Sequence, residues 1–109
     1  MLRKEEVLER TNNGLNIFRH YIACQWRVGR NFFNPLYEDR KASCNIYFDR
    51  RSGVYRIKDF GNDEYSGDCF FFVGKLKGLD CSNGADFVEI LKTINRDILN
   101  KRTESTGKF

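Results

Sequence analysis

Apolar residues recur at helical spacing in the first quarter of the chain and alternate with polar residues in its middle. Residues 3–12 predict a short helix with Leu8 as its main apolar position, and Asn-Asn-Gly at 12–14 interrupts it. A second helix is predicted from apolar residues three or four positions apart, Leu15, Phe18, Ile22 and Trp26. Gly29 would close this helix, and residues 30–33 are predicted to begin a strand.

The alternating stretch predicts a hairpin of two antiparallel strands. Residues 44–49 would form the first strand and residues 54–60 the second, with a loop between them that ends at Gly53. Alternation places Tyr55 and Ile57 on one face of the second strand. The other face would carry Val54, Arg56, Lys58 and Phe60.

Two further helices are predicted after the hairpin, which gives an α+β domain with helices flanking a small antiparallel sheet. Asp68 suits the N-cap of a helix over residues 69–77, and Ala85–Leu99 is amphipathic. The domain would span residues 1–100, and residues 101–109 form a polar tail or linker to a further domain. The residues expected in the core are Ile46, Phe48, Ile57, Phe70 and Phe72.

The 109 residues include 19 basic and 15 acidic side chains, a net charge of +4. The excess is concentrated between Arg27 and Lys58, where eight basic and three acidic residues give +5. Such a stretch is either a solvated face or a surface for an anionic partner, and aromatic residues among the bases favour single-stranded nucleic acid. The charged N-terminus and the lack of a long apolar run predict a cytoplasmic protein without a membrane partner.

A series of short motifs follows in a fixed order along the chain: Glu9-Arg10-Thr11, Gly29-Arg30-Asn31-Phe32, Asn34-Pro35-Leu36-Tyr37, residues 39–44, Asp59-Phe60-Gly61-Asn62, residues 66–73, Lys77-Gly78-Leu79 and Ala85–Leu91. Over roughly residues 5–95, this order resembles the N-terminal zinc-ribbon domain of bacterial DNA primases. The resemblance implies a zinc-ribbon-like fold that contacts single-stranded template DNA in a primase-like replication or mobile-element protein. No feature of this segment indicates catalysis, which would belong to a downstream Toprim-type domain.

The resemblance places the four zinc ligands at Asn34, Tyr37, Asp59 and Asn62, none of which is a cysteine or histidine. Structural zinc sites need four thiolate or imidazole ligands, so no zinc and no other cofactor is expected there. Tyr37 would then fill the vacated site, and packed carbon would replace the metal. An alternative metal site would use His20 and Cys24, four residues apart on one predicted helix face. Otherwise the cysteines are small core residues.

The expected DNA-binding residues are the bases of the hairpin and its flanking loops, together with one aromatic: Arg40, Lys41, Arg50, Arg51, Tyr55, Arg56 and Lys58. A second hypothesis is a protein-interaction module that docks a helicase or its own downstream catalytic domain. It predicts an exposed apolar patch near Phe71 and no binding of DNA.

Overall fold

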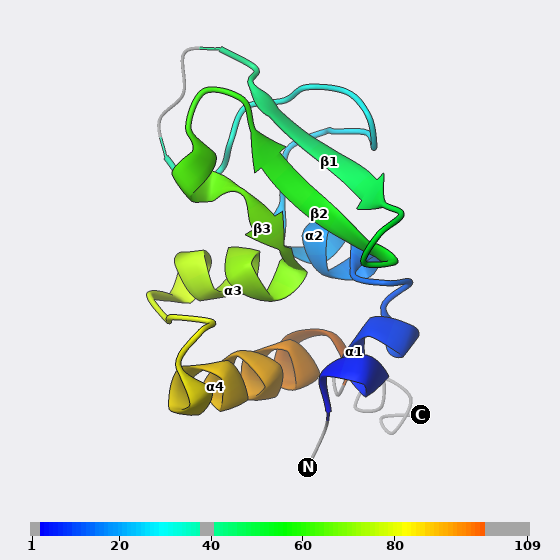
Figure 1. The fold of residues 1–109 in the computed structure, drawn as a ribbon, viewed down its shortest axis with the longest axis vertical. Coiled ribbons are helices and arrows are strands. Elements are labelled where there is room, and N and C mark those ends of the chain that lie inside the picture. Colours follow the sequence, from blue (N-terminus) through cyan, green and yellow to red (C-terminus); the bar gives the residue numbers. More distant parts are fainter. Residues whose placement is uncertain (1–2, 38–40, 100–109) are drawn as a thin grey trace, which may run out of the picture.

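A computed structural model describes residues 3–37 and 41–99, and Figure 1 shows the sheet at one end of the molecule and helices at the other. The elements follow in the order α1 (Lys4–Arg10), α2 (Leu15–Tyr21), β1 (Cys44–Asp49), β2 (Val54–Asp59), a 3-10 turn (Asp63–Tyr65), β3 (Gly67–Asp68), α3 (Cys69–Lys77), α4 (Gly84–Ile94) and a π-helical turn (Asn95–Leu99). The predicted α+β class with flanking helices is confirmed. The predicted tail, residues 101–109, lies outside the described residues.

The sheet is antiparallel with the strand order β1-β2-β3, and the predicted hairpin forms its larger part. Ile46 is paired with Ile57, and Tyr47 is paired with Arg56. Because successive strand residues point to opposite sides, this register defines two faces. The inner face, which carries the buried Ile46 and Ile57, consists of Cys44, Ile46, Phe48, Tyr55, Ile57 and Asp59. The outer face consists of Asn45, Tyr47, Asp49, Val54, Arg56 and Lys58.

Helix α3 has the ends that its sequence predicts. The Asp68 carboxylate accepts a hydrogen bond from the Phe71 backbone N–H at 2.9 Å, and Gly78 ends the helix with a positive φ of 71°. Just before the helix, Gly67 leaves room for the ring of Phe71, which would lie 2.6 Å from an added Cβ. Glycine at this position therefore allows α3 to start directly at the sheet.

The core lies between the inner face and the helices. Phe18 of α2 and Phe72 of α3 contact each other at 5.4 Å between ring centroids, and Phe70 meets Phe87 of α4 at the same distance. Four of the five expected core residues are buried, but the expectation for Phe48 is wrong, because its side chain is 44% exposed. Phe48 lies at the hairpin end of β1, where its ring contacts Tyr55 edge-on.

The N-terminal third departs from the predicted pattern in three places. In α1 the fully buried apolar residue is Val7 and not Leu8. Helix α2 ends at Tyr21, so the predicted continuation to Trp26 is wrong. The predicted strand over residues 30–33 is reduced to a single bridge between Phe32 and Cys44.

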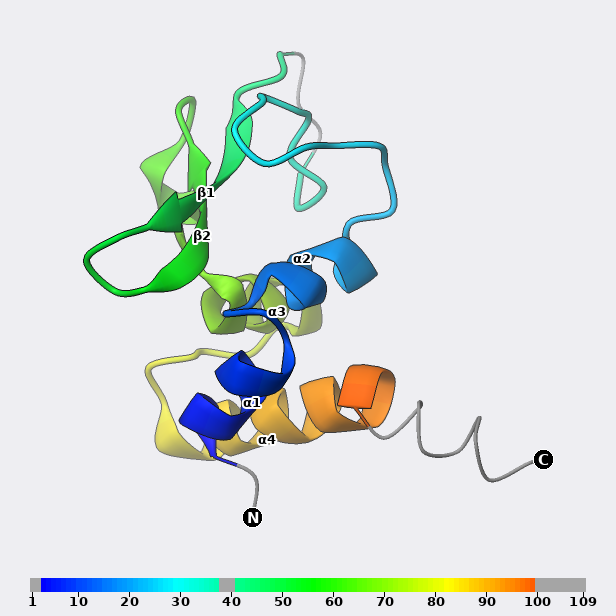
Figure 2. The same ribbon diagram turned by 90° about the vertical axis from the view of Figure 1, so that its right-hand side faces the viewer.

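Tertiary contacts explain why α2 stops where it does. The backbone is extended at Ile22, and the chain then runs beside the sheet, as the cyan segment in Figure 2 shows. The Gly29 N–H donates to the Ile46 carbonyl at 2.9 Å, and the Trp26 ring stacks on Phe32 at 5.6 Å. Trp26 thus reaches the core without a helix. Within the described ranges, no helix has the length and apolar character needed to cross a membrane.

Candidate nucleic-acid interface

The outer face of the hairpin combines cations and aromatic rings. Tyr47 lies directly across from Arg56, and Lys58 follows Arg56 on the same face of β2. Phe60 comes immediately after β2 and is 63% exposed, and the Lys58 ammonium lies 5.3 Å from the centre of its ring. Strand alternation therefore brings two bases and two aromatics to one side of the sheet.

The loop between β1 and β2 adds Arg50 and Arg51, which are both exposed. The Asp49 carboxylate closes this loop by accepting hydrogen bonds from the Ser52 hydroxyl at 2.8 Å and from the Arg51 N–H at 3.2 Å. The Ser52 hydrogen bond is the main reason that the pKa of Asp49 lies below its usual value. The loop is thus held by local bonds that use a carboxylate and a hydroxyl and leave the two guanidinium groups exposed.

The structure places most of the expected DNA-binding residues along one hairpin. Arg56 and Lys58 lie on the outer face, Arg50 and Arg51 lie in its loop, and Lys41 is exposed shortly before β1. Arg40 lies outside the described residues.

Tyr55 is placed on the inner face, half-buried beside Phe48, and its backbone N–H donates to the Asn13 carbonyl. Within the strands, the aromatic residue beside the outer-face cations is Tyr47, which is not among the expected DNA-binding residues. Tyr47 belongs to β1, and the strand register places it opposite Arg56 of β2. Alternation along β2 alone does not give this register.

Three of the four expected ligand positions meet around one carboxylate. Asn34 and Tyr37 donate to Oδ2 of Asp59 at 2.9 and 2.5 Å, and the Ser43 hydroxyl donates to Oδ1 at 3.0 Å. The Gly61 N–H also donates to Oδ1, at 2.8 Å. We call Asn34, Tyr37, Ser43 and Asp59 the Asp59 cluster. The fourth position, Asn62, donates its backbone N–H to the Asp59 carbonyl, and its side chain caps the 3-10 turn.

The Asp59 cluster is a buried anion satisfied by hydrogen bonds. Asp59 is fully buried and Asn34 is 2% exposed. Burial opposes the charge of Asp59, but the donors from Tyr37, Asn34, Gly61 and Ser43 outweigh it and hold the pKa of Asp59 below its usual value. Polar bonds therefore link the segment before β1 to the end of β2, where packed carbon was expected. The Tyr37 hydroxyl reaches the Asp59 carboxylate, and the Tyr37 ring contacts Tyr65 at 4.7 Å between centroids.

Within residues 3–37 and 41–99 no three His, Cys, Asp or Glu side chains gather in a metal-binding arrangement. The predicted pairing of His20 with Cys24 on one helix face is wrong, because α2 ends at Tyr21, before Cys24 is reached. Cys44 and Cys69 are buried core residues, as expected, and burial raises the pKa of the Cys69 thiol. Cys24 is exposed, so it is not a core residue.

The apolar surface expected at Phe71 is largely covered. The Phe71 ring is half-buried against Gly67, and the Lys75 ammonium lies 5.5 Å from its centre. Among the described residues, the two most exposed large apolar side chains are Phe60 and Phe33, which both lie near the start of β1.

Comparison of the chain with protein-family models, with curated proteins and with solved structures gives no match.

Proposed function

We propose that this chain is a single-stranded DNA-binding module of a primase-like replication or mobile-element protein, and that the strand lies along the outer face. The observation that carries the proposal is the alignment of Tyr47, Arg56 and Lys58 across β1 and β2, continued by the exposed Phe60. Proteins that hold single strands combine stacking surfaces with bases that follow the phosphates. Binding would take place in the cytoplasm.

The chemistry of this face favours a nucleic acid over a simple anion. In this proposal the phosphates approach Arg56 and Lys58, while unpaired bases stack on Phe60 and Tyr47. Phe60 suits a base because most of its ring is exposed to solvent. Stacking contributes about 1–3 kcal/mol per base, which is comparable with a good ionic contact and does not depend strongly on base identity. Unpaired bases are therefore the favoured ligand.

The Asp59 cluster supports the primase-like part of the proposal. The resemblance aligned residues 34, 37, 59 and 62 with the ligands of one metal ion, although Tyr37 and Asp59, one from each pair, are 22 positions apart. Residues 34, 37 and 59 share hydrogen bonds, and the backbone of residue 62 is bonded to that of residue 59. A zinc ribbon whose ligands had been replaced would bring the same four positions together in this way.

The test is a fluorescence anisotropy titration with a labelled oligonucleotide at two salt concentrations. Arg56→Ala with Lys58→Ala should weaken binding and lower the slope of log affinity against log salt by about 1.4, which is 0.7 for each lost phosphate contact. The matched control is Arg10→Ala with Lys92→Ala, which removes the same charge at the helical end in Figure 1. Equal affinities for the two double variants would refute the proposed face, and no binding by the wild type would favour the protein-docking hypothesis.

A further inference from the structure

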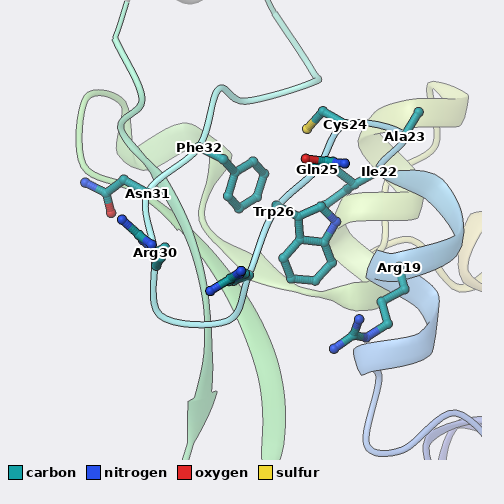
Figure 3. A pocket seen from close by; sticks show the side chains of 10 residues that line it. Arg19, Ile22, Ala23, Cys24, Gln25, Trp26, Arg30, Asn31 and Phe32 are labelled. Atoms are coloured by element: carbon teal, nitrogen blue, oxygen red, sulfur yellow. The ribbon is translucent and has the colours of Figure 1, made fainter.

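A second basic and aromatic site lies between α2 and the edge of β1. Here a groove of about 830 Å³ is lined by residues of α2 and of the segment that follows it. We call it the Trp26 groove, and its lining includes Arg19, Cys24, Trp26, Arg27, Arg30 and Phe32. Figure 3 shows Trp26 and Phe32 side by side, with Arg19 on α2 and Arg30 on the opposite side of the indole. Its volume lies within the range of small-molecule sites.

The charge of the groove is positive. None of the described residues that line it is acidic, and it contains Arg19, Arg27 and Arg30. Among described side chains, the ion pairs are Glu89 with Lys92 and Asp97 with Arg96, both at the C-terminal end of the chain. No described carboxylate therefore forms an ion pair with Arg19, Arg27 or Arg30. The guanidinium groups of these three residues are exposed. The groove is therefore suited to an anion with several oxygens, because guanidinium binds phosphate through paired hydrogen bonds.

The aromatic wall adds a requirement that a simple anion does not meet. Trp26 is half-buried and fixed by stacking on Phe32, with 30° between the rings. The guanidinium carbon of Arg19 lies 5.7 Å from the centre of the indole. At an exposed site this cation–π attraction is weaker than the stacking of a base on an indole. A base can therefore displace Arg19 from the ring.

We propose that the Trp26 groove binds one nucleotide, with its base on Trp26 and its phosphate on Arg27 and Arg30. This nucleotide is either free or one unit of a single strand, and the connection to the sheet favours the strand. Asn31, which also lines the groove, accepts a hydrogen bond at 2.9 Å from Asn45 of the outer face. Asn45 in turn pairs with Lys58. The two surfaces are thus adjacent, and in its strand-bound form this inference rests on the proposed function.

The experiment uses Trp26 as its own reporter, since it is the chain's single tryptophan. Tryptophan fluorescence is followed while dAMP, deoxyadenosine, inorganic phosphate or a short oligo(dA) strand is added. Stacking on the indole should quench the emission with dAMP or with the strand. A second readout is the rate at which iodoacetamide alkylates Cys24, which is exposed in the same groove, compared with the half-buried Cys81. An occupied groove slows the reaction of Cys24 alone.

The variant that tests the phosphate contacts is Arg27→Gln with Arg30→Gln. Both side chains are exposed, so the fold should be retained, which circular dichroism verifies. Loss of two charge-assisted contacts should weaken the affinity for dAMP and for the strand by about tenfold or more. The matched control is Arg3→Gln with Arg10→Gln, which removes two exposed arginines at α1. The control should bind like the wild type.

The outcomes separate this inference from the proposed function. Quenching by the strand that is weakened by the groove variant supports both. Quenching by dAMP in a protein that binds no strand supports the groove as a site for a free nucleotide and refutes the proposed function. Strand binding that leaves Trp26 emission and Cys24 alkylation unchanged, and that tolerates the groove variant, overturns the groove proposal alone. No response to any of these ligands overturns both proposals.

Discussion

The replacement Asp59→Asn tests whether the Asp59 cluster stabilises the fold in place of a metal. The carboxylate accepts two hydrogen bonds at each oxygen, from Ser43 and Gly61 at Oδ1 and from Asn34 and Tyr37 at Oδ2. An asparagine keeps one oxygen and presents an NH2 group to the other pair of donors. Hydroxyl groups can turn to accept from it, but the Gly61 N–H cannot, and the Asn34 amide is fixed because its oxygen already accepts from the Leu36 N–H.

The magnitude follows from these contacts. In either orientation of the new amide, at least one fixed donor loses its acceptor, and the bonds that survive lose the charge. A hydrogen bond to a charged group contributes about 1.5–3 kcal/mol, so Asp59→Asn should lower the free energy of unfolding by about 3 kcal/mol at neutral pH. A domain of this kind has about 5–15 kcal/mol in total, so the variant should remain folded but be clearly weakened.

The pH dependence gives a second prediction for the same residue. The pKa of Asp59 is lower in the folded state than in the unfolded chain, so its contribution is complete above the unfolded value of about 3.9. The contribution is lost as the pH falls further, through the folded value, because the unfolded state then takes up the proton first. The difference in stability between wild type and Asp59→Asn should therefore shrink in acid.

The measurement is urea unfolding followed by circular dichroism, at neutral pH and at about pH 3, where the carboxylate is mostly protonated in the unfolded chain. The matched control is Asp63→Asn, which makes the same chemical change at an exposed residue of the 3-10 turn. If Asp59→Asn unfolds at the same urea concentration as the control at both pH values, the Asp59 carboxylate does not stabilise the fold.

The other predictions concern the same end of the molecule. Gly67→Ala should lower the free energy of unfolding by about 1–3 kcal/mol, because the new Cβ overlaps the Phe71 ring, and an unchanged urea midpoint would contradict this. Phe60→Ala should weaken binding of a single strand by about tenfold without lowering stability, whereas Phe33→Ala, a control of similar exposure, should bind normally in the anisotropy assay. A fourth variant places zinc ligands at the expected positions through Asn34→Cys, Tyr37→His, Asp59→Cys and Asn62→Cys. Elemental analysis should find zinc in this variant, and a metal-free product would contradict the zinc-ribbon resemblance.

Local signals made the hairpin and α3 predictable. Alternation between residues 44 and 59 specified two strands, and the helix ends were marked by Asp68 and Gly78. The basic character of the outer face followed from the same alternation, since Arg56 and Lys58 are two residues apart. Phe48 shows the limit of this reasoning. It was expected in the core and it lies on the inner face, opposite Tyr55, but its side chain is 44% exposed.

The sequence by itself determined the elements whose signals lie within a few residues of one another, which are the hairpin, α3 and most of α4. Only the tertiary structure decided what the segment between α2 and β1 does, because it is held by distant partners: Asn34 meets Asp59 across 25 positions, and the Gly29 N–H donates to the Ile46 carbonyl of β1. Ile22 and Trp26 have the spacing of a helix, but the helix ends at Tyr21 and Trp26 stacks on Phe32. The Asp59 cluster and the Trp26 groove both arise from that segment, since each needs residues that the folded chain alone brings together.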